Sequence, residues 1–228
     1  MAAGQFPPPD GCVTVLPQPS PRDAGVLSLT AHAVVFTDED PAWVRGQLPP
    51  GDLSGPLLPT FLQTLCARTG RRVNNIDMLC VTLPLPGPPP LPLALATGAT
   101  HPRLERALRY RDDVQAWQVR SGIVILGRGV AGRWEVSVEV EPGYRGKGLG
   151  RELAAAARHL LPDSTPLWAQ IAPGNAASVR AFLAAGYHPV GAEALLPLPD
   201  KSRISGNELG AGQDPGIASV NTTDAIPG

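Results

Sequence analysis

The second half of the chain alternates apolar and polar residues in short runs separated by turn signals. Four runs have the bulky, β-prone composition expected of strands: residues 114–120, 123–127, 134–140 and 167–171. The tight-turn pair Ser121-Gly122 separates the first two, and Pro173-Gly174 ends the last. This pattern predicts an antiparallel meander of three strands and, further along, a buried fourth strand.

Helical periodicity lies on both sides of the fourth run. An alanine-rich segment beginning near Arg151 precedes it. Residues 176–183 follow it, with apolar side chains at helical spacing. Asn175 opens this second segment, and Gly186 supplies its C-terminal stop. The second half therefore predicts strands and helices in alternation, as in an α/β protein.

The first hundred or so residues are less regular and rich in proline. Residues 6–21 and 84–92 are expected to be extended or loop segments. Elsewhere the apolar spacing predicts a strand at 13–16, a helix at 22–36, a helix at 57–68, a strand at 72–83 and a helix at 102–110.

A glycine-rich turn joins the run at 134–140 to the alanine-rich helix and reads Arg145-Gly146-Lys147-Gly148-Leu149-Gly150. Glycines at alternate positions let the backbone approach an anion, and the following helix offers free N–H groups and the positive end of its dipole. Arg145, Lys147 and Arg151 add cationic charge. The spacing excludes a P-loop and the dinucleotide fingerprint, so a different pyrophosphate-binding turn is indicated.

The arrangement Arg-x-x-Gly-x-Gly, from Arg145 to Gly150, resembles the acetyl-CoA-binding motif of the GCN5-related N-acetyltransferase (GNAT) family. A helix that opens at Asn175 and closes in Gly186-Tyr187 is similar to the family's second signature. The resemblance covers roughly residues 114–196. It implies an α/β fold with a central mixed sheet, an antiparallel meander, a pyrophosphate loop and flanking helices.

The resemblance implies an N-acetyltransferase that moves an acetyl group from acetyl-CoA to an amine by direct attack. The expected acceptor is a small molecule or a peptide, and the sequence does not identify it or the oligomeric state. The alternative is a non-catalytic module that binds acyl-CoA or a partner. The residues expected to bind the cofactor are Val138, Glu139, Val140, Arg145, Gly146, Lys147, Gly148, Leu149, Gly150, Arg151 and Asn175.

Two carboxylates are candidates for the general base. Glu135 and Glu139 lie on one face of the strand at 134–140, where either could accept a proton from the amine, and both could equally face solvent. The acid is harder to find. Phe182 stands where many relatives have a Tyr, and we interpret Tyr187 as a packing aromatic.

Within this frame the chain divides into four regions. Residues 1–21 form a proline-rich N-terminal segment, and residues 22–112 form a helical leader that could shape the acceptor pocket. Residues 113–198 form the acetyl-CoA-binding core. Residues 199–228 lack apolar periodicity and are expected to be disordered.

Composition narrows the remaining possibilities. Of the 228 residues, 43% are hydrophobic and 17% charged, and the net charge is −1, which gives no electrostatic case for nucleic acid or an anionic membrane as partner. The three cysteines and four histidines have no metal-site spacing, so no metal is expected. The start of the chain has no apolar signal segment, and the cytoplasm is the expected location.

Overall fold

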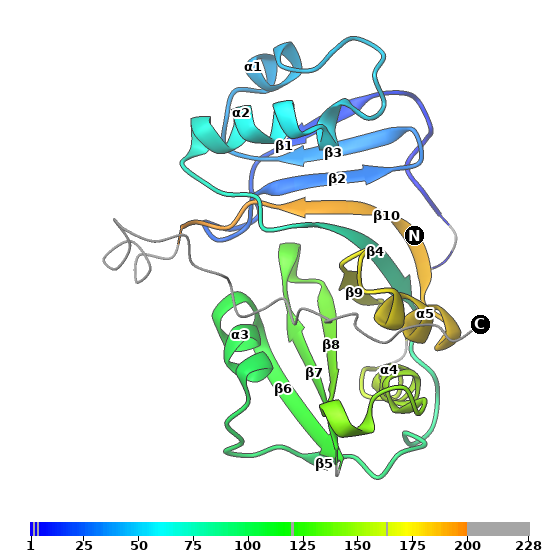
Figure 1. The fold of residues 1–228 in the computed structure, drawn as a ribbon. Helices are drawn as coiled ribbons and strands as arrows, with labels where there is room; N and C mark the ends of the chain where they lie inside the picture. The colour runs from blue at the N-terminus through cyan, green and yellow to red at the C-terminus, as the bar shows by residue number, and fades with distance from the viewer. Residues whose placement is uncertain (2, 4, 120, 163, 200–228) are drawn as a thin grey trace, which may run out of the picture. The chain divides into compact units, whose positions relative to one another are not determined.

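A ten-stranded mixed sheet runs through the part of the chain that the computed structural model describes, namely residues 1, 3, 5–119, 121–162 and 164–199 (Figure 1). Its strands lie in the order β1-β3-β2-β10-β4-β9-β8-β7-β6-β5. Their bounds are β1 Val13–Leu16, β2 Gly25–Leu29, β3 His32–Phe36, β4 Ile76–Thr82, β5 Ala94–Leu95, β6 Asp112–Val119, β7 Gly122–Arg128, β8 Trp134–Val140, β9 Leu167–Ile171 and β10 His188–Leu195.

Helices cover both faces of this sheet. Their bounds are α1 Pro41–Gly46, α2 Pro59–Thr69, α3 Pro102–Tyr110, α4 Leu149–Ala157 and α5 Ala176–Ala184, with short 3₁₀ turns η1 Gly55–Leu57, η2 Val130–Gly132 and η3 Pro142–Tyr144. Apolar side chains of α1, α2, α4 and α5 pack on one face. Ala107 of α3 packs against Ile123 and Ile125 on the opposite face. That second face carries Glu135 and Glu139, because alternation along β8 sets them opposite Val136.

The meander predicted in the second half is confirmed. Strands β6, β7 and β8 pair antiparallel in sequence order, and β9 follows α4 as expected. Four further predictions are confirmed in the first half. The strand at 13–16 is β1, the strand at 72–83 is β4, and the helix at 102–110 is α3. The helix at 57–68 is α2, which is followed by Gly70 with the left-handed φ of +66°.

The helix expected over residues 22–36 is wrong, because this segment forms the β2–β3 hairpin. Val26 pairs with Val35, and both are fully buried under α1 and α2. The same apolar residues satisfy a helical stripe in isolation, but alternation with Leu27 and Val34 on the other face fits a strand. The region 22–112 therefore contains strands as well as helices.

The first and second halves of the chain share the sheet. Strand β4 lies between β9 and β10 and pairs antiparallel with both, while β10, which the pattern did not predict, also pairs with β2. The order of the strands therefore makes the leader part of the structure that supports β8 and β9. The tail expected at 199–228 lies outside the described residues, apart from Pro199.

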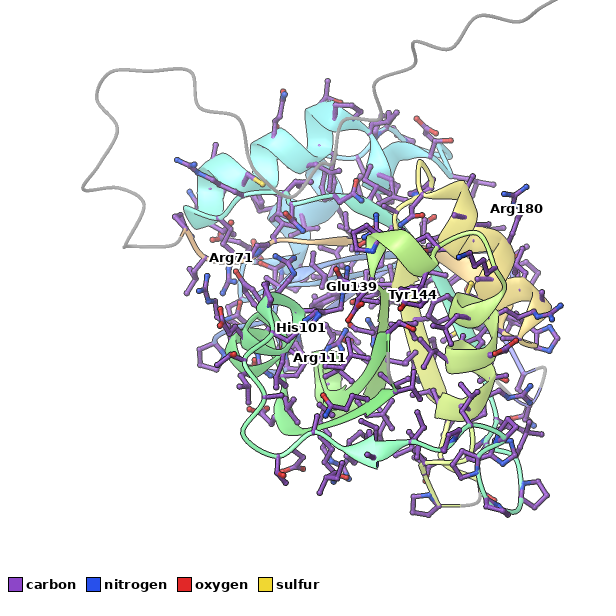
Figure 2. The ribbon with its side chains drawn as sticks, turned by 60° about the horizontal axis from the view of Figure 1, so that its bottom comes forward. Arg71, His101, Arg111, Glu139, Tyr144 and Arg180 are labelled. Carbon is purple, nitrogen blue, oxygen red and sulfur yellow. The ribbon has the colours of Figure 1, made fainter. Side chains whose placement is uncertain are left out.

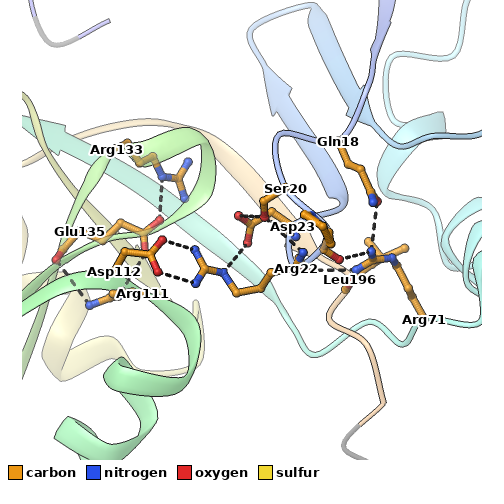
Figure 3. A network of polar contacts seen from close by, with 11 residues as sticks. Gln18, Ser20, Arg22, Asp23, Arg71, Arg111, Asp112, Arg133, Glu135 and Leu196 are labelled. Carbon is orange, nitrogen blue, oxygen red and sulfur yellow. Dashed lines mark hydrogen bonds and ion pairs between the residues drawn. The ribbon is translucent and has the colours of Figure 1, made fainter.

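Arg71 joins the N-terminal loop to the end of the sheet (Figure 3). Its side chain is buried, with the residue 7% exposed, and its guanidinium donates to four oxygens. Three are backbone carbonyls, those of Pro21 (2.8 Å), Arg22 (3.1 Å) and Leu196 (3.0 Å), and the fourth is the amide oxygen of Gln18 (3.1 Å). One side chain thus satisfies acceptors from segments far apart in the sequence.

We expect Arg71→Met to lower the free energy of unfolding by about 2–4 kcal/mol, because it leaves these acceptors without a donor. The matched control is Arg72→Met, since Arg72 is exposed and should change stability by less than about 0.5 kcal/mol. Urea unfolding of both variants measures the difference. Equal stability of the two variants would contradict the role given to Arg71.

Candidate active site

Strands β8 and β9 separate soon after they begin. They run parallel and pair at only two positions, Trp134 with Leu167 and Glu135 with Trp168. Beyond these pairs the edge of β8 that faces β9 has no strand partner in the described residues, whereas its other edge stays paired with β7. An opening therefore lies along β8 from residue 136 to residue 140.

Alternate residues of β8 direct their main-chain groups toward β7 or toward this opening, and the hydrogen bonds with β7 show which residues do which. Glu141 donates to the carbonyl of Ser121 (3.0 Å), and Gly129 donates to that of Arg133 (2.9 Å), so odd-numbered residues of β8 bond with β7. In an antiparallel ladder the alternate residues point away. Val138 and Val140 therefore direct their N–H and C=O groups into the opening, and Glu139 contributes its side chain instead.

The glycine-rich loop follows directly on this strand. Gly146 and Gly148 have φ of +74° and +91°, which glycine adopts without strain, and Gly148 is the residue before α4. Among the described residues, the backbone N–H groups of residues 146–150 have no hydrogen-bond acceptor. Five adjacent donors at a helix N-terminus form a site for an anion such as a pyrophosphate.

Cationic side chains surround the same loop. The Nε of Arg145 donates to the carbonyl of Val140 (3.0 Å), and the Nζ of Lys147 donates to that of Gly143 (3.3 Å). Arg151 is exposed on the first turn of α4. The Arg145 bond occupies one of the carbonyls that face the opening, so a ligand lying there would compete with it.

Asn175 opens α5, as the sequence predicts. Its Oδ1 accepts the backbone N–H of Ser178 (3.1 Å), which leaves its amide NH₂ free for another contact. Because β8 and β9 are parallel, the helices that follow them both begin at the carboxyl ends of these strands. The loop at 145–150 and Asn175 thus lie at the same edge of the sheet.

Glu135 is enclosed by two arginines (Figure 3). Its Oε2 accepts from the Nε of Arg111 (3.0 Å) and its Oε1 from the Nε of Arg133 (2.8 Å). The residue is 3% exposed. A Cβ added to Gly129 would lie 2.2 Å from the Glu135 carboxyl carbon, so only glycine fits beside it. Both oxygens are occupied, which suits a structural ion pair better than a proton acceptor for substrate.

The same network extends across the sheet. Arg133 donates to Glu193 of β10 (2.6 Å), which also accepts from Gln170 of β9, and its guanidinium lies 5.4 Å from the ring centre of Trp168. Burial alone would lower the pKa of Arg133, but the carboxylates of Glu193 and Glu135 outweigh this and raise it. The network joins β8, β9 and β10 at the level where β8 and β9 stop pairing.

Glu139 has a different environment. Its side chain is 33% exposed and lines an open cavity of about 620 Å³, and its Oε2 accepts from the Nε of Arg103 (2.6 Å). Its Oε1 has no partner among the described residues. His101, labelled with Glu139 in Figure 2, also lines this cavity, and its Nδ1 accepts the N–H of Arg103 (3.1 Å). Of the two candidate carboxylates, Glu139 is the one that a substrate can reach.

Sequence reasoning missed several residues of this cavity. Thr100, His101, Gln118 and Glu141 line it with Glu139. The residue before Pro102 stands where a helix N-cap belongs, which is the one local signal that points to His101. The others come together only when the loop at 92–101 folds over the meander.

The interpretation of Tyr187 as a packing aromatic is confirmed. Its ring meets Phe182 edge to face at 4.9 Å, and its hydroxyl donates to the carbonyl of Ala154 (3.2 Å). Burial raises the pKa of Tyr187 far above its usual range. Phe182 belongs to α5 and is itself buried in the core. Neither residue can supply a proton to a leaving group.

In the part of the chain that the structure describes, no group of three or more His, Cys, Asp or Glu side chains could hold a metal ion. No helix there has the length and apolar character that crossing a membrane requires.

Comparison with known proteins supports the resemblance noted above. Residues 111–187 match the family model described as the acetyltransferase (GNAT) family. The matched segment runs from the start of β6 to the end of α5 and contains both the glycine loop and Asn175. The match confirms the GNAT resemblance for this part of the chain. No curated protein matches the chain.

Three solved structures are similar at low identity. A GCN5-related N-acetyltransferase from Kribbella flavida is 19% identical, with 63% of this chain and 66% of that chain covered and a TM-score of 0.41. A GNAT-family protein from Novosphingobium aromaticivorans is 19% identical, with 56% of this chain and 67% of that chain covered and a TM-score of 0.38. A functionally unknown conserved protein from Staphylococcus epidermidis is 12% identical, with 61% of this chain and 66% of that chain covered and a TM-score of 0.39. The chain thus spans slightly less than two thirds of the first structure's length.

We expect Glu135→Gln to lower the free energy of unfolding by about 2–4 kcal/mol, because it leaves the buried Arg111 and Arg133 without a shared counter-charge. Glu39→Gln is the control, since the Glu39–Arg68 pair (2.9 Å) lies at the surface and should contribute less than about 1 kcal/mol. Urea unfolding at neutral pH compares them. A Glu135→Gln protein as stable as the parent would show that the network does not hold the strands.

Proposed function

We propose that this protein is an N-acetyltransferase that transfers an acetyl group from acetyl-CoA to an amine by direct attack. The observation that carries the proposal is the opening between β8 and β9. Main-chain groups of Val138 and Val140 face it, five free N–H groups lie at one end, and the Glu139 side chain lies in a cavity beside it.

The residues present fit a CoA thioester. The N–H groups of residues 146–150 would bind the pyrophosphate, helped by the dipole of α4 and by Arg145, Lys147 and Arg151. The main chain of Val138 and Val140 would pair with the pantetheine amides as a neighbouring strand does. A backbone N–H from this edge would also polarise the thioester carbonyl. Arg145 would release the Val140 carbonyl as the ligand enters.

Glu139 would act as the base. Its side chain lines the cavity, and the bond from Arg103 to one oxygen orients the carboxylate while the other oxygen stays without a partner among the described residues. Acetyl-CoA supplies an activated acyl group whose thiolate is a good leaving group. A thiol loses its proton near pH 8.5 in model compounds, so the thiolate can leave with water as its proton source and needs no side-chain acid. Transfer by this route therefore does not require Phe182 or Tyr187 to supply a proton.

One observation favours a second candidate function. Phe182 has no hydroxyl, and the hydroxyl of Tyr187 is bonded to the Ala154 carbonyl within the core, so neither residue provides an acid for the departing thiolate. A protein that retains the CoA clamp but binds acyl-CoA without turnover would have the same arrangement. Release of free CoA, measured with a panel of primary amines, separates the two: turnover with any amine supports the enzyme, and tight CoA binding without turnover supports the binding module.

The clamp makes a sharper test. Gly148→Val should weaken CoA binding by about 1–3 kcal/mol, because a branched side chain at φ of +91° distorts the turn that presents the N–H groups. Gly51→Val is the matched control. Gly51 also has a positive φ (+73°), is exposed with no atom within 4 Å of an added Cβ, and lies outside the glycine-rich loop, so the same strained substitution there should leave CoA affinity close to that of the parent.

Calorimetry with CoA measures both variants, and circular dichroism checks that each is folded. Unchanged affinity in a folded Gly148→Val protein would remove the loop from the cofactor site.

For catalysis, Glu139→Gln should lower turnover roughly 10²–10⁴-fold while CoA affinity stays nearly constant, because the amide cannot accept the proton. The pH profile should change as well. In Glu139→Gln the rise of the rate with pH should move to the higher pH at which the amine itself is deprotonated. Full activity with the original profile would exclude Glu139 as the base.

A further inference from the structure

We propose that the acceptor is a short diamine, a primary amine that carries a second cationic nitrogen, with Glu141 binding the second nitrogen. This inference rests on the proposed function and names the class of acceptor. It starts from the cavity of about 620 Å³ beside Glu139, whose volume suits a small molecule.

The charged side chains that line the cavity are acidic. Among the described residues its charged lining side chains are Glu139 and Glu141, and only Glu139 has a cationic partner, Arg103. His101, Thr100 and Gln118 add groups able to form hydrogen bonds. Apolar side chains complete the wall: Pro92, Ala94, Ala99, Val119, Ile123 and Pro142. Such a surface attracts a cation and offers contacts to a hydrocarbon chain, while it repels an acceptor that carries a carboxylate.

Glu141 is the carboxylate without a counter-charge. Arg103 already pairs with Glu139, but the Glu141 side chain has no hydrogen bond or ion pair among the described residues. The nearest cation along the chain, Arg145, is bonded to the Val140 carbonyl. The Glu141 backbone is fixed at both ends, since its N–H donates to Ser121 (3.0 Å) and its carbonyl accepts from Tyr144 (2.9 Å). An exposed, unpaired carboxylate on a fixed backbone at the cavity is suited to a cation from outside the chain.

The spacing of the two carboxylates sets the size of the ligand. Residues two apart on an extended chain project to the same side, and their Cα atoms are about 6.6 Å apart. Two ammonium groups joined by a short methylene chain match this separation, with one at Glu139, where the proton is removed, and the other at Glu141. The apolar wall would then contact the methylenes. A monoamine of the same length would lose the second contact.

Three probes of equal length test the inference: putrescine with two ammonium groups, n-butylamine with one, and γ-aminobutyrate with a carboxylate in place of the second. Calorimetry on the full chain, saturated with CoA, should show putrescine binding roughly three- to tenfold tighter than n-butylamine, and γ-aminobutyrate weakest. Added salt should weaken putrescine most, because its two contacts are both electrostatic.

The variant Glu141→Gln should remove the preference for putrescine and leave n-butylamine unchanged. Glu105→Gln is the control, because Glu105 is an exposed glutamate of α3 that does not line the cavity, and the preference should persist in it. The same three amines, tested as acceptors by release of free CoA, should show the preference in KM more than in kcat.

The outcomes separate this inference from the function on which it rests. Equal binding of the three probes, no binding of putrescine, or a putrescine preference that survives Glu141→Gln overturns the diamine assignment, even where other amines are acetylated. Loss of CoA binding or of all acyl transfer overturns the proposed function instead. A preference that disappears in Glu141→Gln and persists in Glu105→Gln supports the assignment.

Discussion

The buried pairing of Arg133 with Glu135 and Glu193 fixes the point at which the sheet opens. Backbone pairing between β8 and β9 ends at Glu135 and Trp168, and a sheet that opens inside its own core would otherwise leave this point without support. One guanidinium contacts carboxylates on β8 and β10 and stacks on a ring of β9. Such a group is stabilising only while all its partners are present, since any partner left alone would be a buried, uncompensated charge.

From that point onward the two candidate carboxylates acquire different roles on the same face of one strand. Glu135 lies where the pairing of β8 with β9 ends, and both its carboxylate oxygens are bound to arginine. Glu139 lies four residues further, about 13 Å along an extended strand. There the strands have separated, one carboxylate oxygen is free, and a cavity is adjacent. Alternation makes the two residues equivalent in sequence. Their different distances from the point where the strands separate make Glu135 a structural group and leave Glu139 accessible to a ligand.

The sequence predicts what depends on local chemistry. The meander, the turn at Gly148 and the cap at Asn175 follow from β-propensity, from glycine's tolerance of positive φ and from side-chain capping. What depends on distant partners could not be predicted in this way. The apolar spacing of segment 22–36 predicts a helix, but in the fold its first strand, β2, pairs with β10. Likewise, Arg111, Arg133 and Glu193 join one network only because the fold brings them together. Nothing in the spacing of these three residues marks them.

The part of the site proposed for the cofactor could be predicted from the sequence, whereas the part proposed for the acceptor could not. Most groups proposed for the cofactor come from one continuous stretch, the end of β8 and the loop into α4, with Asn175 apart from it, so a short motif can identify them. Groups for the acceptor come from two places, since His101 and Thr100 belong to the leader while Glu139 and Glu141 belong to the strand. Substitutions in the loop at 92–101 can therefore change the shape of the cavity without altering the loop proposed to bind the pyrophosphate. A family motif can accordingly identify the donor, whereas the acceptor has to be inferred from the charge and shape of this particular cavity.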